Sequence, residues 1–284
     1  MTGNKYALVT GATSGIGYEF ARILAENKHN LILVARDEIR LSEVAKELKS
    51  KYNVETTILA KDLFHPDQAK EIFDFTQNNG MEVDVLINDA GQGEWGKFVE
   101  TDLERDLDLI NLNVLSLVSL TKYYMKQMVA RNDGKILQVS SLLSRYPTPL
   151  MAVYSATKAF VLAFSQALIY ELKDTQVTMT VLLPGGTDTD FFHKSGSEHS
   201  VIYNETDLST PEEVAKDGYE ALMNGESKIV SGFKNKAQDL MSNFMSEQMK
   251  AATMHKQMKT SNEPDKKKSA EHAASQRERE RINN

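Results

Sequence analysis

Short apolar runs alternate with longer amphipathic stretches along most of this chain. The runs predict seven strands, at residues 6–10, 31–35, 55–60, 83–87, 135–140, 178–183 and 228–230. Helical periodicity lies between them, most clearly at 38–52, 103–130 and 152–173. Strands that are apolar on both faces and alternate with helices form a parallel sheet covered on both sides. The pattern therefore predicts one doubly wound α/β sheet.

This pattern stops near residue 232, and the remainder divides into two parts. Residues 233–259 form a predicted amphipathic helical extension, whose clearest stretch is 237–258; its apolar positions are Leu240, Met241, Phe244, Met245, Met249 and Ala252. Such a helix packs on its own domain or covers a partner subunit or the substrate mouth, and we favour the second reading. Residues 260–284 are charged and nearly devoid of apolar residues, so we expect a disordered tail or a solvated helix end.

A glycine-rich turn follows the first strand at once. Residues 10–17 read T-G-A-T-S-G-I-G, and a helical pattern begins at Ile16. Glycines allow a tight turn and a close approach to a pyrophosphate, and the helix N-terminus adds free N–H groups. Strand, glycine turn and helix together predict a dinucleotide site.

Tyr154 and Lys158 lie four residues apart in a helical stretch, which places a phenol and an ammonium on one helix face. At about 4 Å and an effective dielectric near 20, the cation contributes about 4 kcal/mol, or roughly three pKa units. That would bring the phenol near neutrality, where acid–base catalysis is effective.

Together these motifs resemble the short-chain dehydrogenase/reductase superfamily, from about residue 4 to about 230. The chain matches the family's T-G-x-x-x-G-x-G loop and its Y-x-x-x-K pair. Ser141 stands thirteen residues before Tyr154, as the family's active-site serine does, Asn113 matches the asparagine of the central helix, and P-G-x-x-x-T begins at Pro184. Ser140 is a competitor that the spacing disfavours.

The resemblance implies a Rossmann fold and specific residue roles. Tyr154 would exchange a proton with the substrate oxygen, Ser141 would hydrogen-bond that oxygen, Lys158 would lower the tyrosine pKa, and Asn113 would hold a water. The expected cofactor-binding residues are Gly11, Thr13, Ser14, Gly15, Ile16, Gly17, Arg36, Asp62, Leu63, Asn88, Ala90, Gly91, Tyr154, Lys158, Pro184, Gly185, Thr187 and Thr189.

One position departs from the family. Its N-N-A-G motif reads N-D-A-G at 88–91, so that Asp89 replaces an amide that steadies the central strand. We expect a rearranged local hydrogen bond and no loss of activity.

The residue after the second strand favours NADP over NAD. Arg36 stands where an acidic residue would bind the ribose 2′-hydroxyl, and a guanidinium grips a 2′-phosphate instead. Ser14 can add a hydroxyl to the same phosphate. Asp37 is the competing ribose ligand, but it fits the N-cap of the helix at 38–52.

The substrate is less defined by the sequence. We expect Leu142, Leu143, Tyr146 and Pro147 to line an apolar pocket and residues 187–204 to form a lid, with His193 and His199 facing solvent. These features predict a partly apolar ketone, aldehyde or alcohol.

The composition restricts the kinds of metal site, partner and cellular location that we expect. The chain has no cysteine, which excludes disulfides and thiolate metal sites, and we predict no metal. The formal charge of −7 argues against nucleic acid, and the absence of a long apolar run predicts a cytoplasmic protein with no membrane partner. By resemblance we expect a homodimer or homotetramer.

The sequence leaves two other classes open. A non-catalytic NADP-binding regulator would be expected to lack Tyr154, Lys158 or Ser141, and all three are present. A nucleotide-sugar epimerase would have a differently spaced glycine loop and a larger C-terminal domain. We therefore predict an NADP(H)-dependent carbonyl or alcohol oxidoreductase.

Overall fold

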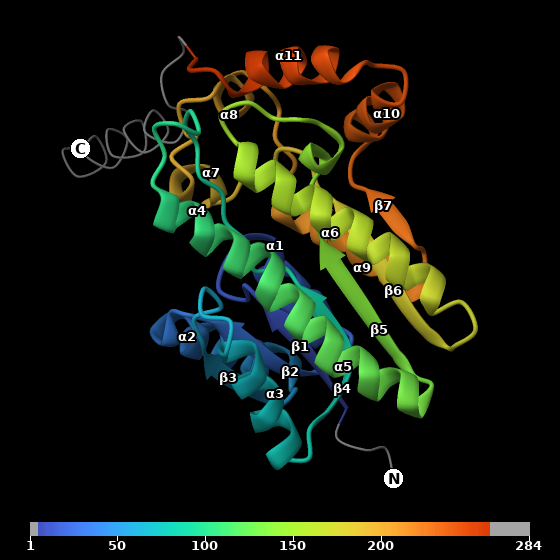
Figure 1. Cartoon of the computed structure of the whole chain (residues 1–284). Coiled ribbons are helices and arrows are strands. Elements are labelled where there is room, and N and C mark those ends of the chain that lie inside the picture. The colour runs from blue at the N-terminus through green and yellow to red at the C-terminus, as the bar shows by residue number, and fades with distance from the viewer. Residues whose placement is uncertain (1–4, 262–284) are drawn as a thin grey trace, which may run out of the picture.

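Residues 5–261 are described by the structure, a computed structural model (Figure 1). Seven parallel strands form one sheet in the order β3-β2-β1-β4-β5-β6-β7. The strands are β1 Lys5–Thr10, β2 Asn30–Ala35, β3 Thr56–Ala60, β4 Glu82–Asn88, β5 Gly134–Val139, β6 Val177–Leu183 and β7 Lys228–Val230. The predicted doubly wound Rossmann fold is confirmed, with each strand within one or two residues of its expected ends.

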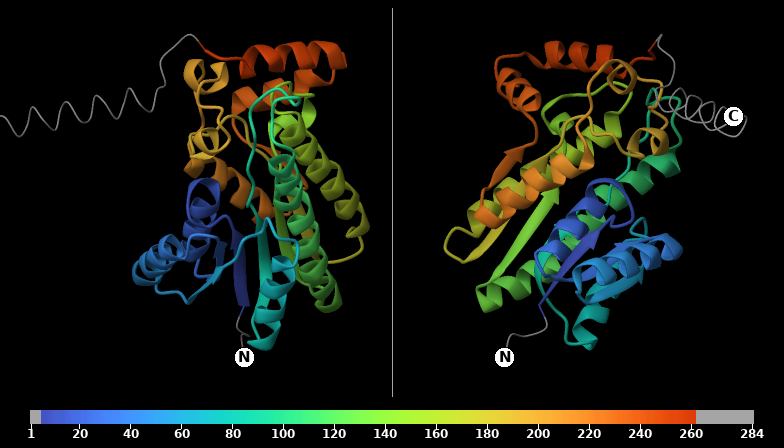
Figure 2. Two further views of the ribbon diagram at one scale, coloured as in Figure 1. Left: turned by 60° about the vertical axis from the view of Figure 1, so that its left-hand side comes forward. Right: turned by 180° about the vertical axis from the view of Figure 1, so that it is seen from behind.

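Helices cover both faces of this sheet, as the views from the front and from behind show (Figures 1 and 2). One face carries α1 Gly15–Glu26, α2 Glu38–Tyr52 and α9 Pro211–Asn224; the other carries α3 Gln68–Asn78, α4 Leu103–Ile110, α5 Leu117–Arg131 and α6 Ala152–Glu171. Local sequence sets their ends. α9, for example, begins with a capping box between Thr210 and Glu213 and ends at Gly225, whose φ is +71°.

Neighbouring residues of a strand point to opposite faces of the sheet and pack into two separate hydrophobic cores. Leu33 packs with Leu24 on the side of α1, whereas Ile32 packs with Leu86 and Tyr124 on the side of α5. Both strand residues are fully buried. Burial on both faces explains why the strands read as unbroken apolar runs rather than as alternating ones.

The helical stretch at 103–130 is not a uniform α-helix. α4 passes into a π-helical segment, η1 Asn111–Ser116, and then into α5. Such π segments are frequent at functional sites. This one contains Asn113, so the irregular turn lies where the sequence predicts a site residue.

The C-terminal extension differs from the single helix expected at 237–258. It forms two helices, α10 Phe233–Ser242 and α11 Glu247–Met258, because Ser246 ends the first pattern and caps the second by accepting a hydrogen bond from Met249 N at 3.3 Å. α11 packs against α8 Val201–Glu205, with Met254 and Met258 buried. Most of the predicted charged tail, from residue 262 on, lies outside the described residues.

By length and composition, α6 is apolar enough to cross a membrane, with a mean hydropathy of 1.3 over its best window. It packs against β6 and against η2 Leu142–Arg145, and it carries Tyr154 and Lys158 into the centre of the molecule. We therefore describe it as a core helix of the sheet layer.

Candidate active site

A cavity of about 1350 Å³ opens at the carboxyl ends of the strands. It lies where the strand order reverses between β1 and β4, the position at which open α/β sheets bind ligands. Sixteen of the eighteen predicted cofactor residues line it, together with Ser141. Gly17, Asn88 and the predicted catalytic Asn113 do not line it.

Gly17 acts behind the cavity wall instead. A Cβ atom at this position would lie 2.4 Å from Gly11 O and 2.6 Å from Asp89 Oδ2. Only glycine lets α1 approach β1 this closely.

Asn88 also lies behind the cavity wall and holds neighbouring elements together. Its buried Nδ2 donates to Thr121 Oγ1 at 3.1 Å and to Gln138 Oε1 at 3.0 Å.

The N-terminus of α1 fits a pyrophosphate. Gly11 and Gly15 have φ values of +72° and +58°, which turn the loop beneath the helix end. Within the described chain, the first turn of α1 carries no acidic residue, and the Ser14 side chain makes no capping hydrogen bond. The free N–H groups and the positive end of the helix dipole are therefore available to an anion.

The far end of the cavity is basic. Arg36 lines it and stacks over the Phe64 ring, with Cζ 4.8 Å from the centroid. Asp37 is the N-cap of α2, as predicted, and accepts from Arg40 N at 3.0 Å. Arg40 and Lys61 also line this end. Sequence reasoning missed both, although Arg40 stands one helical turn after Arg36.

Tyr154 and Ser141 lie together on the cavity floor. Both are buried, and their side-chain hydroxyls are close enough for Ser141 to affect the pKa of Tyr154. Ser141 Oγ also accepts from Leu143 N at 3.1 Å, which holds the hydroxyl at the end of β5. Ser140 Oγ is used differently, since it donates to Lys158 O at 2.8 Å. The geometry thus agrees with the choice of Ser141 over Ser140.

The expected lowering of the Tyr154 pKa is not found in the structure. Lys158 Nζ lies 5.9 Å from the centroid of the Tyr154 ring and donates to Val139 O at 2.8 Å. Burial raises the pKa of Tyr154, and the nearby Asp89 carboxylate raises it further. The sequence argument assumed a close cation and omitted desolvation, which is the larger effect here.

Asn113 and Lys158 converge above Gly91. A Cβ atom at Gly91 would lie 3.2 Å from Lys158 Nζ and 3.3 Å from Asn113 Oδ1. Asn113 Nδ2 donates to Gln92 O at 2.9 Å and to Thr157 Oγ1 at 3.0 Å. Its side chain therefore fixes the chain beside Lys158, and its role toward a water stays a prediction.

Asp89 lies between the glycine loop and Lys158. Its backbone N–H donates to Thr10 Oγ1 at 3.0 Å, while a hydrogen bond from the Gly17 backbone reaches its carboxylate. Burial raises its pKa to about 7, and the Lys158 ammonium opposes this rise. Burial in turn lowers the pKa of Lys158. The departure from the family motif thus places an ionisable group next to the proposed catalytic residues.

An apolar wall forms the other half of the cavity. It includes Leu142, Leu143, Met151, Phe191, Ile202 and Met258. The Phe191 ring lies 5.0 Å from that of Tyr154. Phe191 begins α7 Phe191–Lys194, so part of the expected lid contributes to this wall. Two expectations are wrong, because Tyr146 is buried beneath α10 and Pro147 points to solvent, and neither lines the cavity.

The histidines of this segment stay outside the cavity lining. His193 is half-buried, and its Nε2 lies 3.3 Å from the Tyr203 hydroxyl, whereas His199 is exposed.

The C-terminal extension supplies a residue of the apolar wall that was not predicted from the sequence. Met258 lines the cavity, and its carbonyl accepts from Trp95 Nε1 at 2.8 Å.

Comparison with known proteins gives the family of this chain. The model of the short chain dehydrogenase family matches residues 5–200. The chain therefore belongs to the short-chain dehydrogenase/reductase superfamily.

Among characterised relatives, the chain is 40% identical over 186 residues to the very-long-chain 3-oxoacyl-CoA reductase of Rattus norvegicus. That match covers 63% of this chain and only 58% of the rat protein. It is 31% identical over 235 residues to the 7beta-hydroxysteroid dehydrogenase of Mediterraneibacter gnavus, covering 82% of this chain and 88% of that protein.

Solved structures give the same architecture. A short-chain dehydrogenase from Sphingobium yanoikuyae in complex with NADPH superposes with a TM-score of 0.75 at 28% identity, covering 85% of this chain and 97% of that one. A 7beta-hydroxysteroid dehydrogenase structure superposes with a TM-score of 0.78 at 25% identity, covering 89% and 97%.

Proposed function

We propose that this protein is an NADP(H)-dependent oxidoreductase that interconverts a carbonyl compound and its alcohol, with Tyr154 as the acid/base. The observation that carries the proposal is the pair of hydroxyls of Tyr154 and Ser141, buried between the basic cofactor end and the apolar wall. The bound nicotinamide would supply or accept the hydride. The residues of the chain then have to bind the cofactor and the substrate, orient the carbonyl group and supply its proton.

Each residue role follows from its position. Ser141 holds the substrate oxygen, because Leu143 N fixes its hydroxyl. Tyr154 gives a proton to that oxygen in reduction and removes it in oxidation. Lys158 lines the cavity near Gly91 and would bind the nicotinamide ribose hydroxyls, as the family resemblance implies. The apolar wall limits the access of water.

Arg36 supports the choice of NADP. It is exposed at the cavity rim, where a ribose phosphate would lie, and Phe64 holds its guanidinium plane. The Sphingobium structure contains NADPH. We expect NADPH to be used in clear preference to NADH.

The apolar wall and the relatives together favour a bulky, largely apolar carbonyl compound as the substrate. Relatives act on a very-long-chain 3-oxoacyl-CoA and on a 7beta-hydroxysteroid, by their names. We propose that Met151, Phe191 and Met258 contact the apolar part of a ketone, aldehyde or alcohol.

The experiment is a screen of ketones, aldehydes and alcohols that follows the absorbance of reduced nicotinamide with each cofactor. Tyr154→Phe should lower turnover at least about a hundredfold, as loss of a general acid does. Undiminished turnover in Tyr154→Phe would exclude the catalytic assignment, and a preference for NADH would exclude the role of Arg36.

We also propose a cytoplasmic homodimer or homotetramer. Exposed apolar side chains run along α4 and α6, including Leu103 at 63%, Leu107 at 45% and Tyr170 at 70% exposure. A row of this kind is typical of a subunit interface. Sedimentation of the wild type and of Leu107→Glu should give different masses; a monomeric wild type would contradict the proposal.

A further inference from the structure

Helix α10 is oriented with its apolar face outward. At 100° per residue, Phe233, Ala237, Leu240 and Met241 fall within an arc of about 100°, and Phe244 follows two residues after the helix ends. All five are exposed, Phe233 by 86%, Phe244 by 85%, and Leu240 and Met241 by 63% each. An ordinary surface helix buries this face and exposes its polar one, so the arrangement here is reversed.

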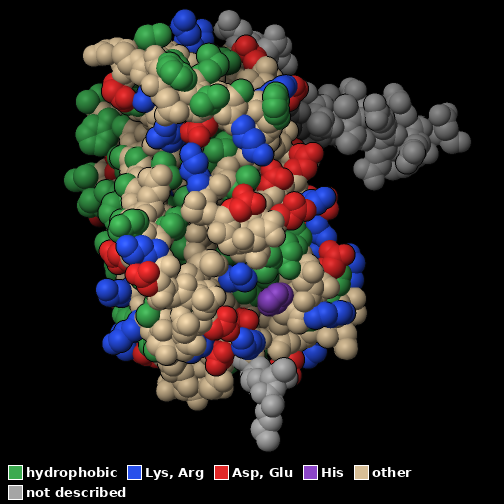
Figure 3. All heavy atoms as spheres, turned by 90° about the vertical axis from the view of Figure 1, so that its right-hand side faces the viewer, with side chains coloured by type: hydrophobic (Ala, Val, Ile, Leu, Met, Phe, Trp, Pro, Cys, Tyr) green, Lys and Arg blue, Asp and Glu red, His purple; other side chains and the backbone are tan. Residues whose placement is uncertain are grey.

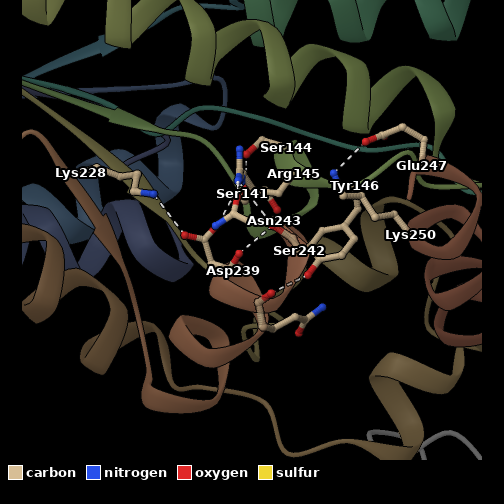
Figure 4. Close-up of polar contacts among 11 residues, drawn as sticks. Ser141, Ser144, Arg145, Tyr146, Lys228, Asp239, Ser242, Asn243, Glu247 and Lys250 are labelled. Atoms are coloured by element: carbon tan, nitrogen blue, oxygen red, sulfur yellow. Dashed lines mark hydrogen bonds and ion pairs between the residues drawn. The ribbon is translucent and has the colours of Figure 1, made fainter. Parts of the chain in front are cut away.

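Polar contacts hold the helix in that orientation (Figure 4). Asp239 Oδ1 accepts from Arg145 Nε at 2.9 Å, and its Oδ2 accepts from Lys228 Nζ at 3.1 Å. Arg145 also donates to Asn243 Oδ1 at 2.6 Å. The Tyr146 hydroxyl donates to Gln238 O at 2.7 Å. Because the polar side is fixed to the domain, rotation that would bury the apolar side would break these contacts.

The extension that carries this face is basic, although one of its lysines, Lys234, pairs with Asp207 at 2.9 Å. Residues 233–259 contain five lysines and two acidic residues, although the whole chain has a formal charge of −7. Both acidic residues are paired, Asp239 as described and Glu247 with Lys250 at 2.8 Å. Figure 3 shows hydrophobic side chains gathered at the top of this side of the molecule, with both basic and acidic side chains around them.

The face also borders the cavity. Phe233 and Lys234 line the cavity together with Gln238, so the outward apolar face continues to its mouth. Lys234 and Lys236 flank the apolar arc on its two sides. Apolar residues at the centre of a helix face with lysines at its edges are typical of helices that lie in the interface of a lipid bilayer.

We propose that α10 docks the protein on an anionic lipid surface, with its apolar face in the bilayer interface and the cavity mouth facing the lipid. This revises the expectation of no membrane partner. A second copy in a symmetric contact would bring two identical basic surfaces face to face, which disfavours that occupant. The docking does not depend on the proposed reaction, since it is a property of the extension.

The test measures cosedimentation of the full-length protein with phosphatidylcholine vesicles, with or without roughly 30% phosphatidylserine. We expect binding to the anionic vesicles, and weaker binding at high salt. The double variant Leu240→Ser/Phe244→Ser should weaken binding at least about tenfold, because the buried apolar area drives insertion. Neither substituted residue lines the cavity.

A matched control is the double variant Ile39→Ser/Val99→Ser, which removes two equally exposed apolar residues, at 77% and 88%, far from α10. It should bind as the wild type does. Circular dichroism and NADPH binding of each variant establish that the fold is retained. The proposal fails if the wild type does not bind anionic vesicles, if Leu240→Ser/Phe244→Ser binds normally, or if that variant instead abolishes self-association measured by sedimentation.

Discussion

At the scale of single residues, Asp89 has a predictable pH signature. Its raised pKa means that the native state retains a proton that the unfolded chain gives up above its ordinary value of 3.8. Stability contributed by this proton is present below pH 4, is lost as the pH rises toward about 7, and stays lost above that.

Asp89→Asn should therefore raise the free energy of unfolding more at pH 8 than near pH 4, because the burial penalty of the charged carboxylate is then removed. Urea unfolding at the two pH values measures this difference. The Asn variant should otherwise keep its hydrogen bonds, because the backbone of Asp89 donates to Thr10. An equal effect at both pH values would show that ionisation of Asp89 is not involved.

Two adjacent serines make a second residue-level prediction. Ser141→Ala should lower kcat about a hundredfold, because Ser141 faces the cavity with Tyr154, and should cost about 1 kcal/mol of stability, because Leu143 N loses its acceptor. Ser140→Ala should cost a similar amount, about 1 kcal/mol, since its hydroxyl donates to Lys158 O, and should leave kcat nearly unchanged. Turnover of both variants separates the two roles, and urea unfolding measures the two losses of stability; a larger turnover loss in Ser140→Ala would reverse the assignment.

At the scale of elements, the carboxylate that anchors α10 should be essential for its orientation. Asp239→Asn leaves the partly buried Arg145 and the exposed Lys228 without their counter-charge. We expect a loss of about 1–3 kcal/mol and faster proteolysis at the α10 end of the chain. Asp207→Asn is the control, because its ion pair with Lys234 is exposed. Equal proteolysis of both variants would contradict this anchoring.

The sequence predicted most of these elements because strand burial and glycine turns are local signals. The cluster at the carboxyl ends of the strands then follows from parallel topology, which brings Gly11, Ser141 and Pro184 to one edge. Three features could not be predicted from the sequence. The partner of Lys158 is a backbone carbonyl on another element. The apolar positions from 237 to 258 follow one continuous helical period, so the break before Ser246 does not show in the sequence pattern. The outward face of α10 depends on ion pairs between residues distant in sequence.

At the scale of the whole molecule, the cavity joins segments that are far apart in the chain, from the glycine loop to α11. A ligand that fills it should therefore stabilise the domain as one unit. NADPH at about 100 times its Kd should add about 2.7 kcal/mol to the free energy of unfolding. Thermal denaturation should show one transition that moves upward with NADPH and moves less with NADH; equal shifts would remove the case for NADP preference.

The hydrogen bond between Trp95 and the Met258 carbonyl has a further consequence. It ties α11, the last helix of the described residues, to the loop after β4, while Met258 itself lines the cavity. Chimeras that exchange only residues 247–258 between homologues should then trade substrate preference and leave the hydride-transfer machinery intact. Substitutions confined to this short helix would then change the substrate preference while the rest of the enzyme stays as it is.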